Sequence, residues 1–275
     1  MTGSFPFGIR KPSSSSRLVV LDKSFLDGVN EATLKHLVAN GWLFALPEVL
    51  MYEHFRKEDN RRTANMFKLH AVEDSVFILP GVGEMFRAEA KESKPATTFL
   101  PAKRITFIVE KGPSGKYFEL DERSVRSVEE RTAELNREVA GLLSDWHDIR
   151  GMPDVKNATP SELPDIIRQL SEKVRDDRED IRGFYRNHRH KPFPDPHLIN
   201  EKWSYFRWIQ VTLLAGLDFV ERYGVNVEPS KETLMHEVLD LTYLINALLI
   251  GGVASRDATI VRRFKFLLST GVVLR

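Results

Sequence analysis

Four acidic residues stand where the strands and helices of an alternating α/β pattern are expected to meet. They are Asp22, Glu53, Asp240 and Asp257. Carboxylates that gather in one place repel one another, so either their pKa values rise or a divalent cation neutralises them. Hard oxygen ligands suit Mg²⁺ or Mn²⁺, and such an ion can generate hydroxide and stabilise charge on a phosphate. The chemistry expected of these acids is therefore metal-assisted hydrolysis of a phosphodiester bond.

Two of the acids come just after short apolar segments that are typical of buried strands. Asp22 ends the segment 17–22, and Asp257 follows the segment 252–255. The carboxyl ends of parallel strands share one edge of a sheet, and open α/β sheets bind their ligands at that edge. We therefore expect Asp22 and Asp257 to meet there, although they are far apart in the sequence.

A length argument brings Asp240 to the same edge. Asp240 lies in a predicted helix, 231–250, which precedes the strand at 252–255 and runs antiparallel to it. From Asp240 to Ile250 the helix rises about 15 Å. From Gly252 to Asp257 the extended chain returns roughly 17 Å. The helix and the strand therefore cover the same height, and Asp240 arrives beside Asp257.

The position of the remaining acid leaves two candidates. Glu53 follows the predicted strand 42–46 by about two helical turns, and Val49 and Leu50 place it on the inward stripe of its helix. Glu48 is nearer to the end of the strand and is the alternative. An acid on an apolar stripe needs a partner, because an unpaired buried carboxylate is costly.

The elements that would position these acids alternate along both ends of the chain. Predicted strands occupy residues 17–22, 42–46, 76–80, 252–255 and 271–274, and predicted helices occupy 31–40, 47 to beyond 55, 203–223, 231–250 and 260–269. Such alternation predicts a three-layer, Rossmann-like α/β fold with a parallel sheet. Gly41 and Gly224 are the expected ends of two of the helices.

The middle of the chain has a different pattern, which indicates an insertion. We assign residues 17–83 and 201–275 to the α/β domain and residues 84–200 to a mostly helical inserted subdomain. Two long amphipathic helices are expected within it, at 122–148 and 161–185, with a β-hairpin at 104–110 and 116–120 around a Gly-Pro-Ser-Gly turn. Residues 1–16, which end in four serines, are expected to form a flexible lead.

The composition excludes several classes of protein. The chain has no cysteine, so a disulfide scaffold and a cysteine-ligated zinc site are excluded. Its net charge of +1 provides no strong global field for a nucleic acid. The apolar segment 241–254 is shorter than the ~20 residues of a membrane span, and residues 1–16 lack the apolar core of a signal peptide. A cytoplasmic protein without membrane contact is expected.

Local basic clusters are the expected contacts to a nucleic-acid backbone. The candidate residues are Lys57, Arg61, Arg62, Arg186 and Arg189. The first cluster follows Glu53 and would flank the acidic edge, while the second lies beside Tyr185, which could stack on a base of a single strand. The alternative for the second cluster is a solvated helix end.

The residues around the acids resemble the motifs of the PIN-like nuclease domain. The segment 19–26 is similar to its first motif, in which a strand ends in Asp and a small hydroxyl residue follows two positions later. The segment 46–53 is similar to the second motif, and 240–244 followed by 253–257 is similar to the third and fourth. Ser255 stands where many members have Thr. The resemblance covers residues 17–80 and 203–275.

This resemblance implies a Mg²⁺- or Mn²⁺-dependent endoribonuclease in which Asp22, Glu53, Asp240 and Asp257 hold the metal. Ser24 and Ser255 would orient ligands or water. The implied substrate is single-stranded RNA, with DNA as a second candidate. A homodimer, an inhibitory protein partner and a toxin or defence setting are compatible with the family.

Other interpretations of the same residues remain open. An Asp after a strand is often a helix cap, and the Asp-Lys-Ser at 22–24 is similar to the start of phosphotransferases that form an aspartyl phosphate, although their second Asp is absent. The turn at 112–116 lacks the spacing of a phosphate-binding loop. A different kind of protein, a PIN-like scaffold that has lost catalysis and binds RNA or a protein, is the main alternative.

Overall fold

The structure is a computed structural model that describes residues 17–56, 60–98, 100, 103–104, 109, 117, 122–187 and 195–275. The predicted flexible lead at 1–16 lies outside these residues. So do most residues of the predicted hairpin at 104–110 and 116–120.

The centre of the fold is a six-stranded sheet with the strand order β4-β3-β2-β1-β5-β6. Its strands are β1 Arg17–Leu21, β2 Trp42–Leu46, β3 Val76–Ile78, β4 Lys103–Arg104, β5 Gly252–Ala254 and β6 Val272–Leu274. All neighbours are parallel except β3 and β4, which are antiparallel. Val19, Val20 and Leu21 of β1 are completely buried, as expected for a parallel strand that is covered on both faces.

The order of the strands reverses between β1 and β5. Val20 of β1 pairs with Ala45 of β2 on one side and with Val253 of β5 on the other. The chain moves outward from β1 through β2 to β3, and later from β5 to β6 in the opposite direction. In open α/β sheets the crevice outside the carboxyl ends at such a reversal is where ligands bind.

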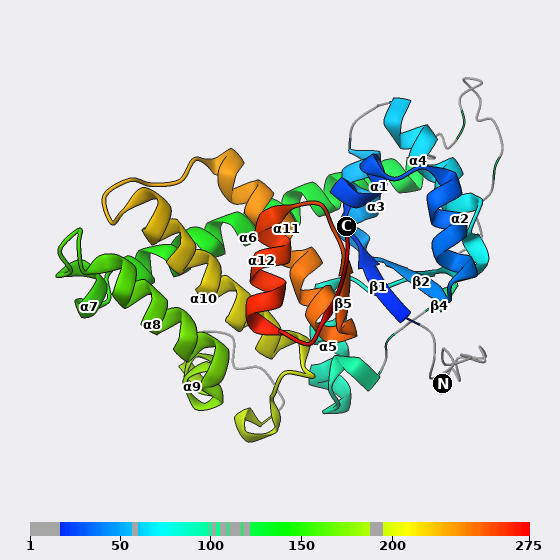
Figure 1. Cartoon of the computed structure of the whole chain (residues 1–275). Helices are drawn as coiled ribbons and strands as arrows, with labels where there is room; N and C mark the ends of the chain where they lie inside the picture. The colour runs from blue at the N-terminus through cyan, green and yellow to red at the C-terminus, as the bar shows by residue number, and fades with distance from the viewer. Residues whose placement is uncertain are drawn as a thin grey trace.

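Helices cover both faces of the sheet, which agrees with the predicted three-layer α/β architecture. Figure 1 shows α2 (Glu31–Ala39) on one side of the strands and α11 (Lys231–Ile250) with α12 (Ala258–Leu267) on the other. Helix α2 packs on β2, and α11 packs on β1 and β5. The shorter helices α1, α3 and α4, over Lys23–Gly28, Glu48–Phe55 and Asn60–His70, follow β1 and β2.

Two glycines make the connection from α11 to β5 very short. Gly251 ends α11 with a φ of 87°, a left-handed conformation that favours glycine. At Gly252 a Cβ atom would lie 2.8 Å from the Leu18 carbonyl oxygen, so the close approach of β5 to β1 requires glycine. Because α11 turns at once into β5, the residues near its middle come level with the carboxyl end of the strand.

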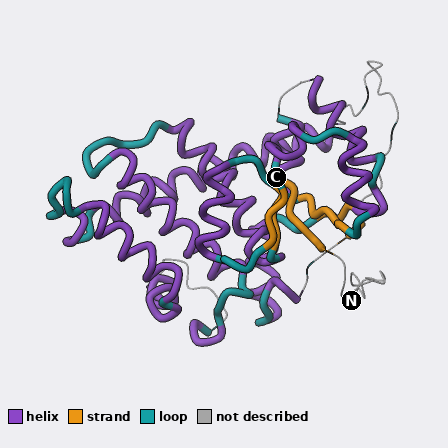
Figure 2. Tube along the Cα trace, in the orientation of Figure 1, coloured by secondary structure: helices purple, strands orange, loops and turns teal. Residues whose placement is uncertain are grey.

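A helical region extends away from the sheet (Figures 1 and 2). Its helices are α5 Val82–Glu92, α6 Glu122–Arg150, α7 Pro153–Lys156, α8 Leu163–Asp176, α9 Arg178–Asn187 and α10 Ser204–Tyr223. Helix α10 falls in the segment assigned to the α/β domain, but it packs against α6, α8 and α9 as well as α11. Apolar residues of the sheet and of this helical region belong to one continuous core.

The predicted single helix at 161–185 is wrong, because two helices, α8 and α9, occupy this segment. Asp177 between them has an extended backbone with φ −97° and ψ 98°. Its Oδ1 accepts the backbone N–H groups of Glu179 at 2.9 Å and of Asp180 at 3.2 Å. Asp177 therefore starts a new helix in the manner of an N-cap.

The start of α10 is fixed by one buried carboxylate. Glu89 of α5 is only 1% exposed. It accepts hydrogen bonds from the backbone N of Ser204 (2.6 Å), Ala96 (2.9 Å) and Tyr205 (3.3 Å) and from the Ser204 hydroxyl (2.8 Å). Two of these donors are the otherwise unpaired N–H groups at the beginning of a helix. Glu89 thus joins α5 to α10.

Helix α11 is the one helix in the described ranges that is long and apolar enough to cross a membrane. However, 72% of its apolar window is buried inside the protein. This burial is typical of a core helix, and it agrees with the prediction that the apolar segment 241–254 is a buried helix followed by a strand.

Candidate active site

Asp22 lies at the carboxyl end of β1 and is only 4% exposed. Its Oδ2 accepts a hydrogen bond from the Ser255 hydroxyl at 2.6 Å and another from the Ser24 hydroxyl. The side chain does not cap α1, so the helix-cap interpretation does not hold for this residue. Burial raises the pKa of Asp22; the two hydroxyls oppose this rise, and the nearby Asp257 adds to it.

The two serines connect Asp22 with the start of α12. The Ser24 hydroxyl oxygen accepts the backbone N–H of Arg256 at 2.9 Å and of Asp257 at 3.2 Å. The Ser255 hydroxyl oxygen also accepts the Asp257 N–H, at 3.0 Å. Each hydroxyl thus receives an N–H and donates its own proton to the same carboxylate oxygen. Ser24 and Ser255 hold the carboxyl ends of β1 and β5 together and orient Asp22.

Asp257 caps a helix and also belongs to the acidic group. Its Oδ1 accepts the backbone N–H groups of Thr259 at 2.7 Å and Ile260 at 2.9 Å, at the start of α12. It also raises the pKa values of Asp22 and Asp240 through charge repulsion. The cap interpretation is therefore right for Asp257, and it does not remove the residue from the site.

Glu53 reaches the same edge from α3. Its Oε2 accepts a hydrogen bond from the Tyr243 hydroxyl at 2.5 Å, and Tyr243 of α11 is only 1% exposed. Burial raises the pKa of Glu53, and the charge of Asp22 raises it further, against the Tyr243 hydrogen bond and the charges of Lys23 and Arg56. Tyr243 is absent from the sequence prediction. Its signal is its place one turn after Asp240 on an apolar helix, where a buried tyrosine needs a partner.

Glu48, the alternative to Glu53, faces a different part of the protein. The charges that act on its carboxyl group belong to Arg131, Glu84, Glu134 and Glu138, on α5 and α6. Its Oε2 lies against Gly81, where a Cβ atom would collide with it. Of the two candidates, Glu53 is the one whose pKa responds to Asp22.

Asp240 is the acid with the largest perturbation. Burial, followed by the charges of Glu237, Asp257 and Asp22, raises its pKa to about 8. Within the described residues its carboxylate has no hydrogen bond or ion pair. The acids predicted at this edge therefore act on one another electrostatically, with Asp22 affected by Asp257 and affecting both Glu53 and Asp240.

A buried ion-pair network lies beside Asp240. Arg263 of α12 is 2% exposed; its Nε donates to Asp218 Oδ2 at 2.6 Å and its Nη1 donates to Glu237 Oε1. Arg262 also pairs with Asp218, at 2.8 Å. Glu237 lies one helical turn before Asp240. The sequence gives no signal for this network, because buried arginines are rare and a charged pair looks like a solvated face.

The donor set fits a hard dication that keeps several water ligands. Asp22, Glu53, Asp240 and Asp257 offer carboxylate oxygens, and Asp240 is half-buried with no hydrogen bond or ion pair among the described residues. No three His, Asp or Glu side chains within the described ranges are arranged as a ready cage for one ion. Mg²⁺ is usually bound through one or two carboxylates together with water, so these acids suit it and Mn²⁺.

The structure describes only some of the basic residues predicted to contact a nucleic-acid backbone. Lys57, Arg189 and the side chain of Arg61 lie outside the described residues. Arg62 is 8% exposed and lies over the Phe55 ring, so it packs inside the protein rather than facing a substrate as predicted.

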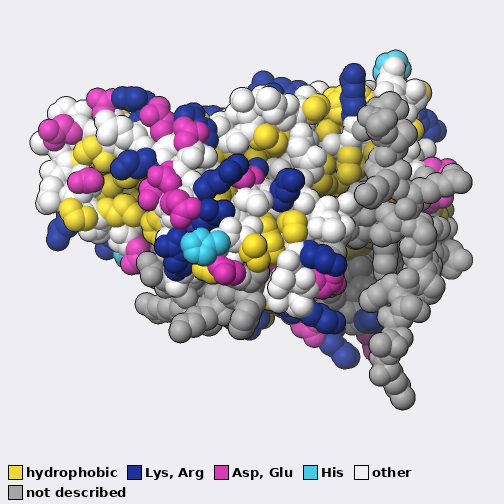
Figure 3. All heavy atoms as spheres, turned by 90° about the horizontal axis from the view of Figure 1, so that it is seen from below, with side chains coloured by type: hydrophobic (Ala, Val, Ile, Leu, Met, Phe, Trp, Pro, Cys, Tyr) yellow, Lys and Arg dark blue, Asp and Glu magenta, His cyan; other side chains and the backbone are white. Residues whose placement is uncertain are grey.

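The described arginine of the second basic cluster is engaged in its own helix. Arg186 pairs with Glu179 at 3.1 Å on α9, clear of the sheet in Figure 1. This favours the solvated helix end over a substrate contact. Basic and acidic side chains are interspersed on the face seen in Figure 3, without a broad basic surface among the coloured atoms.

Comparisons with known proteins give no match: no family model, no curated protein and no solved structure is similar to this chain at a significant level.

Proposed function

We propose that this chain is a metal-dependent nuclease of the PIN-like kind that hydrolyses phosphodiester bonds in RNA. What supports the proposal is that four acids from separate segments act on one another's charge at the edge where the strand order reverses, with Asp22 affected by Asp257, and Glu53 and Asp240 affected by Asp22. Three of them, Asp22, Glu53 and Asp240, have raised pKa values because they are buried near one another. Strongly perturbed acids in one place are typical of functional sites.

The electrostatics of the site favour a cation. Mutual repulsion and burial make the ionised acids costly, and no described cation forms an ion pair with Asp240, although the charge of Arg263 opposes part of the rise in its pKa. A dication held by these acids, one or two of them directly and the others through water, would remove that cost. Mg²⁺ or Mn²⁺ supplies two things when bound, a lowered pKa for an attacking water and neutralisation of charge on the phosphate.

The surrounding residues have positioning roles in this proposal. Ser24 and Ser255 fix the Asp22 carboxylate, and the Tyr243 hydroxyl fixes Glu53. The Asp257 backbone is held by both serines while its Oδ1 caps α12. Four segments are thus locked by short hydrogen bonds, and such preorganisation keeps ligands in place without reorganisation during the reaction.

The choice of RNA rests on the resemblance of the motifs at 19–26, 46–53, 240–244 and 253–257 to the PIN-like domain. The order of the motifs and the parallel α/β sheet support that resemblance. DNA remains the second candidate substrate. The cytoplasmic location and a homodimeric or inhibitory partner also stay predictions.

Cleavage of a labelled single-stranded RNA tests the proposal. We expect cleavage with Mg²⁺ or Mn²⁺ and none with EDTA. We expect Asp22→Asn and Asp257→Asn to lose about 100-fold or more, since even supporting residues of metal sites cost 10–100-fold. Glu48→Gln is the matched control, because Glu48 faces α5 and α6, and it should retain activity. Unchanged cleavage by both Asn variants would refute the assigned site.

One observation favours a second candidate, a PIN-like scaffold that binds RNA or a protein without cleaving. The described acids do not form a ready three-ligand cage. This candidate predicts that the wild type binds single-stranded RNA but cleaves neither RNA nor DNA at any Mg²⁺ or Mn²⁺ concentration. A rise in melting temperature with Mn²⁺ that is absent in Asp22→Asn would count against it.

A further inference from the structure

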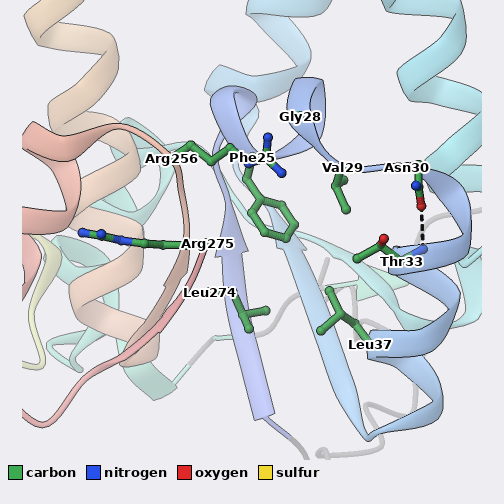
Figure 4. A pocket seen from close by; sticks show the side chains of 9 residues that line it. All are labelled: Phe25, Gly28, Val29, Asn30, Thr33, Leu37, Arg256, Leu274 and Arg275. Carbon is green, nitrogen blue, oxygen red and sulfur yellow. Dashed lines mark hydrogen bonds between the residues drawn. The ribbon is translucent and has the colours of Figure 1, made fainter.

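A pocket of about 300 Å³ lies next to the acidic edge. Its walls come from α1, the connection to α2, α2 itself and the segments that follow β5 and end β6, and Figure 4 shows the side chains that line it. Phe25, Val29, Leu37 and Leu274 form an apolar wall, and Asn30, Thr33 and Arg256 add polar groups. This volume is at the lower end of the range for small-molecule sites, which suits a single planar base rather than a larger ligand.

The pocket is tied to the acidic group through the backbone. Phe25 follows Ser24, and Arg256 stands between Ser255 and Asp257. The Arg256 backbone N–H donates to the Ser24 hydroxyl at 2.9 Å, and that hydroxyl donates to Asp22. The pocket and the acidic group therefore share the segments 24–25 and 255–257 at the carboxyl ends of β1 and β5.

Arg256 supplies a cation at this pocket. Its side chain is exposed and has no hydrogen bond or ion pair within the described ranges. In Figure 4 it reaches across toward Phe25 and Gly28, whereas the guanidinium of Arg275 points away from the pocket. A Cβ atom at position 28 would overlap the Arg256 guanidinium, so Gly28 leaves the space that Arg256 occupies. A free guanidinium between an apolar pocket and an acidic edge suits a phosphate.

We propose that this pocket receives one base of a single-stranded substrate, and that Arg256 binds the phosphate that leads from this base to the acids. The inference rests on the proposed nuclease function and adds a determinant of substrate class. A base enters such a pocket only when it is unstacked and unpaired, so the pocket selects single strands over duplexes. Arg256 contributes one phosphate contact, which makes the affinity depend on salt.

Binding measured without cleavage separates this inference from the nuclease proposal. The probe is a fluorescent six-nucleotide single-stranded RNA, and its anisotropy is followed with EDTA present. We expect Arg256→Ala to weaken binding about 10-fold and to reduce the slope of log affinity against log salt by about 0.7, the loss of one phosphate contact on a single strand. We expect Gly28→Ala to weaken binding severalfold with no change in net charge. Arg275→Ala is the control with the same charge change, and it should bind as the wild type does.

A second measurement tests the base. The probes are RNAs that each lack the base at one position. We expect one of these RNAs to bind the wild type more weakly than the intact RNA does. The double variant Arg256→Ala, Leu37→Phe, in which Phe fills the pocket, should bind that RNA and the intact RNA equally. Equal effects of Arg256→Ala and Arg275→Ala, or full affinity of Gly28→Ala, would overturn the inference even if RNA is cleaved. Pocket-dependent binding by a protein that cleaves nothing would support the inference and refute the nuclease proposal. Melting temperatures of all variants show whether each one folds.

Discussion

Two regions of this protein shield a carboxylate from water, and the partners of that carboxylate differ: Glu89 is fully buried and Asp240 is half-buried. Glu89 in the helical region accepts hydrogen bonds from three backbone N–H groups and one hydroxyl. Asp240 at the sheet edge accepts none from the described residues, and the charges of neighbouring acids raise its pKa while that of Arg263 lowers it. Burial raises the pKa of both groups. The difference teaches that a raised pKa has two origins: burial of a carboxylate that keeps its own donors, as at Glu89, and partial burial beside other acids, as at Asp240.

The ion-pair network around Arg263 is a third way in which this protein compensates shielded carboxylates. Asp218 and Glu237 are also buried, but a guanidinium rather than backbone N–H groups compensates them. Glu237 and Asp240 are one turn apart on α11, so the compensated and uncompensated acids share a helix. The contrast gives three expectations, which we order by the size of the effect.

The largest effect is expected from Arg263→Met. This change leaves Asp218 and Glu237 buried without their central cation, and breaking a buried pair in this way costs about 3–5 kcal/mol of unfolding free energy. Urea denaturation measures the loss. Arg262→Met is the control, because its side chain is 56% exposed and a surface pair contributes about 1 kcal/mol or less. If both variants lose a similar free energy of unfolding, Arg263 contributes no more than a surface arginine, and its compensation of the two buried acids is contradicted.

A smaller loss is expected from Glu89→Ala. The change leaves N–H groups of Ala96, Ser204 and Tyr205 without an acceptor, and unsatisfied buried groups cost about 1–3 kcal/mol. Thermal unfolding followed by circular dichroism measures it, with the exposed Glu92→Ala on the same helix as control. A loss no greater than that of Glu92→Ala would mean that the α10 start is satisfied in another way, and the contrast with Asp240 would break.

The smallest expected effect is a gain in stability, from Asp240→Asn. The folded pKa of Asp240 is raised from 3.8 to about 8, so the folded protein holds a proton that the unfolded chain releases between these pH values. Stability is therefore present at low pH and is lost as pH rises toward 8. In EDTA at pH 8, we expect the free energy of unfolding of Asp240→Asn to exceed that of the wild type by about 1–2 kcal/mol. The gain is limited to this size because relaxation and water penetration reduce the cost of ionising Asp240 in the folded protein. At pH 5 the difference should shrink.

Two controls sharpen the Asp240 experiment. Asp165→Asn changes an exposed acid, whose side chain is 73% exposed, and should leave stability unchanged at both pH values. Saturating Mn²⁺ should stabilise the wild type more than Asp240→Asn, since only a state that binds the ion gains from it. If Asp240→Asn destabilises the protein at pH 8 as Glu89→Ala does, Asp240 is a satisfied carboxylate and the comparison fails.

The sequence predicted the positions of Asp22, Asp240 and Asp257 at the sheet edge because local patterns and lengths determine them. A buried strand that ends in an acid is visible in its apolar run, and the rise of α11 can be computed from residue spacing. The start of α9 also has a local signal in the sequence, namely Asp177 at the position of an N-cap.

The remaining details depend on contacts between distant segments. Nothing near Tyr243 in the sequence indicates that its hydroxyl meets Glu53 from another helix. Arg62 and Arg263 were indistinguishable from surface arginines, because hydrophobic periodicity does not report which charged side chain is enclosed by neighbours. Side-chain pairing across long sequence separations therefore marks the limit of the prediction.

The pairing of β1 with β5 has a consequence for synthesis of the protein in a cell. Val20 pairs with Val253, which the ribosome adds about 230 residues later. At roughly 5–20 residues per second, β1 waits on the order of ten to fifty seconds for this neighbour. Throughout that delay the nascent polypeptide carries an open strand edge, which invites aggregation, and Asp22 lacks both Ser255 and Asp257. A cell that makes this protein thus has an interval for chaperones to act before the acids assemble.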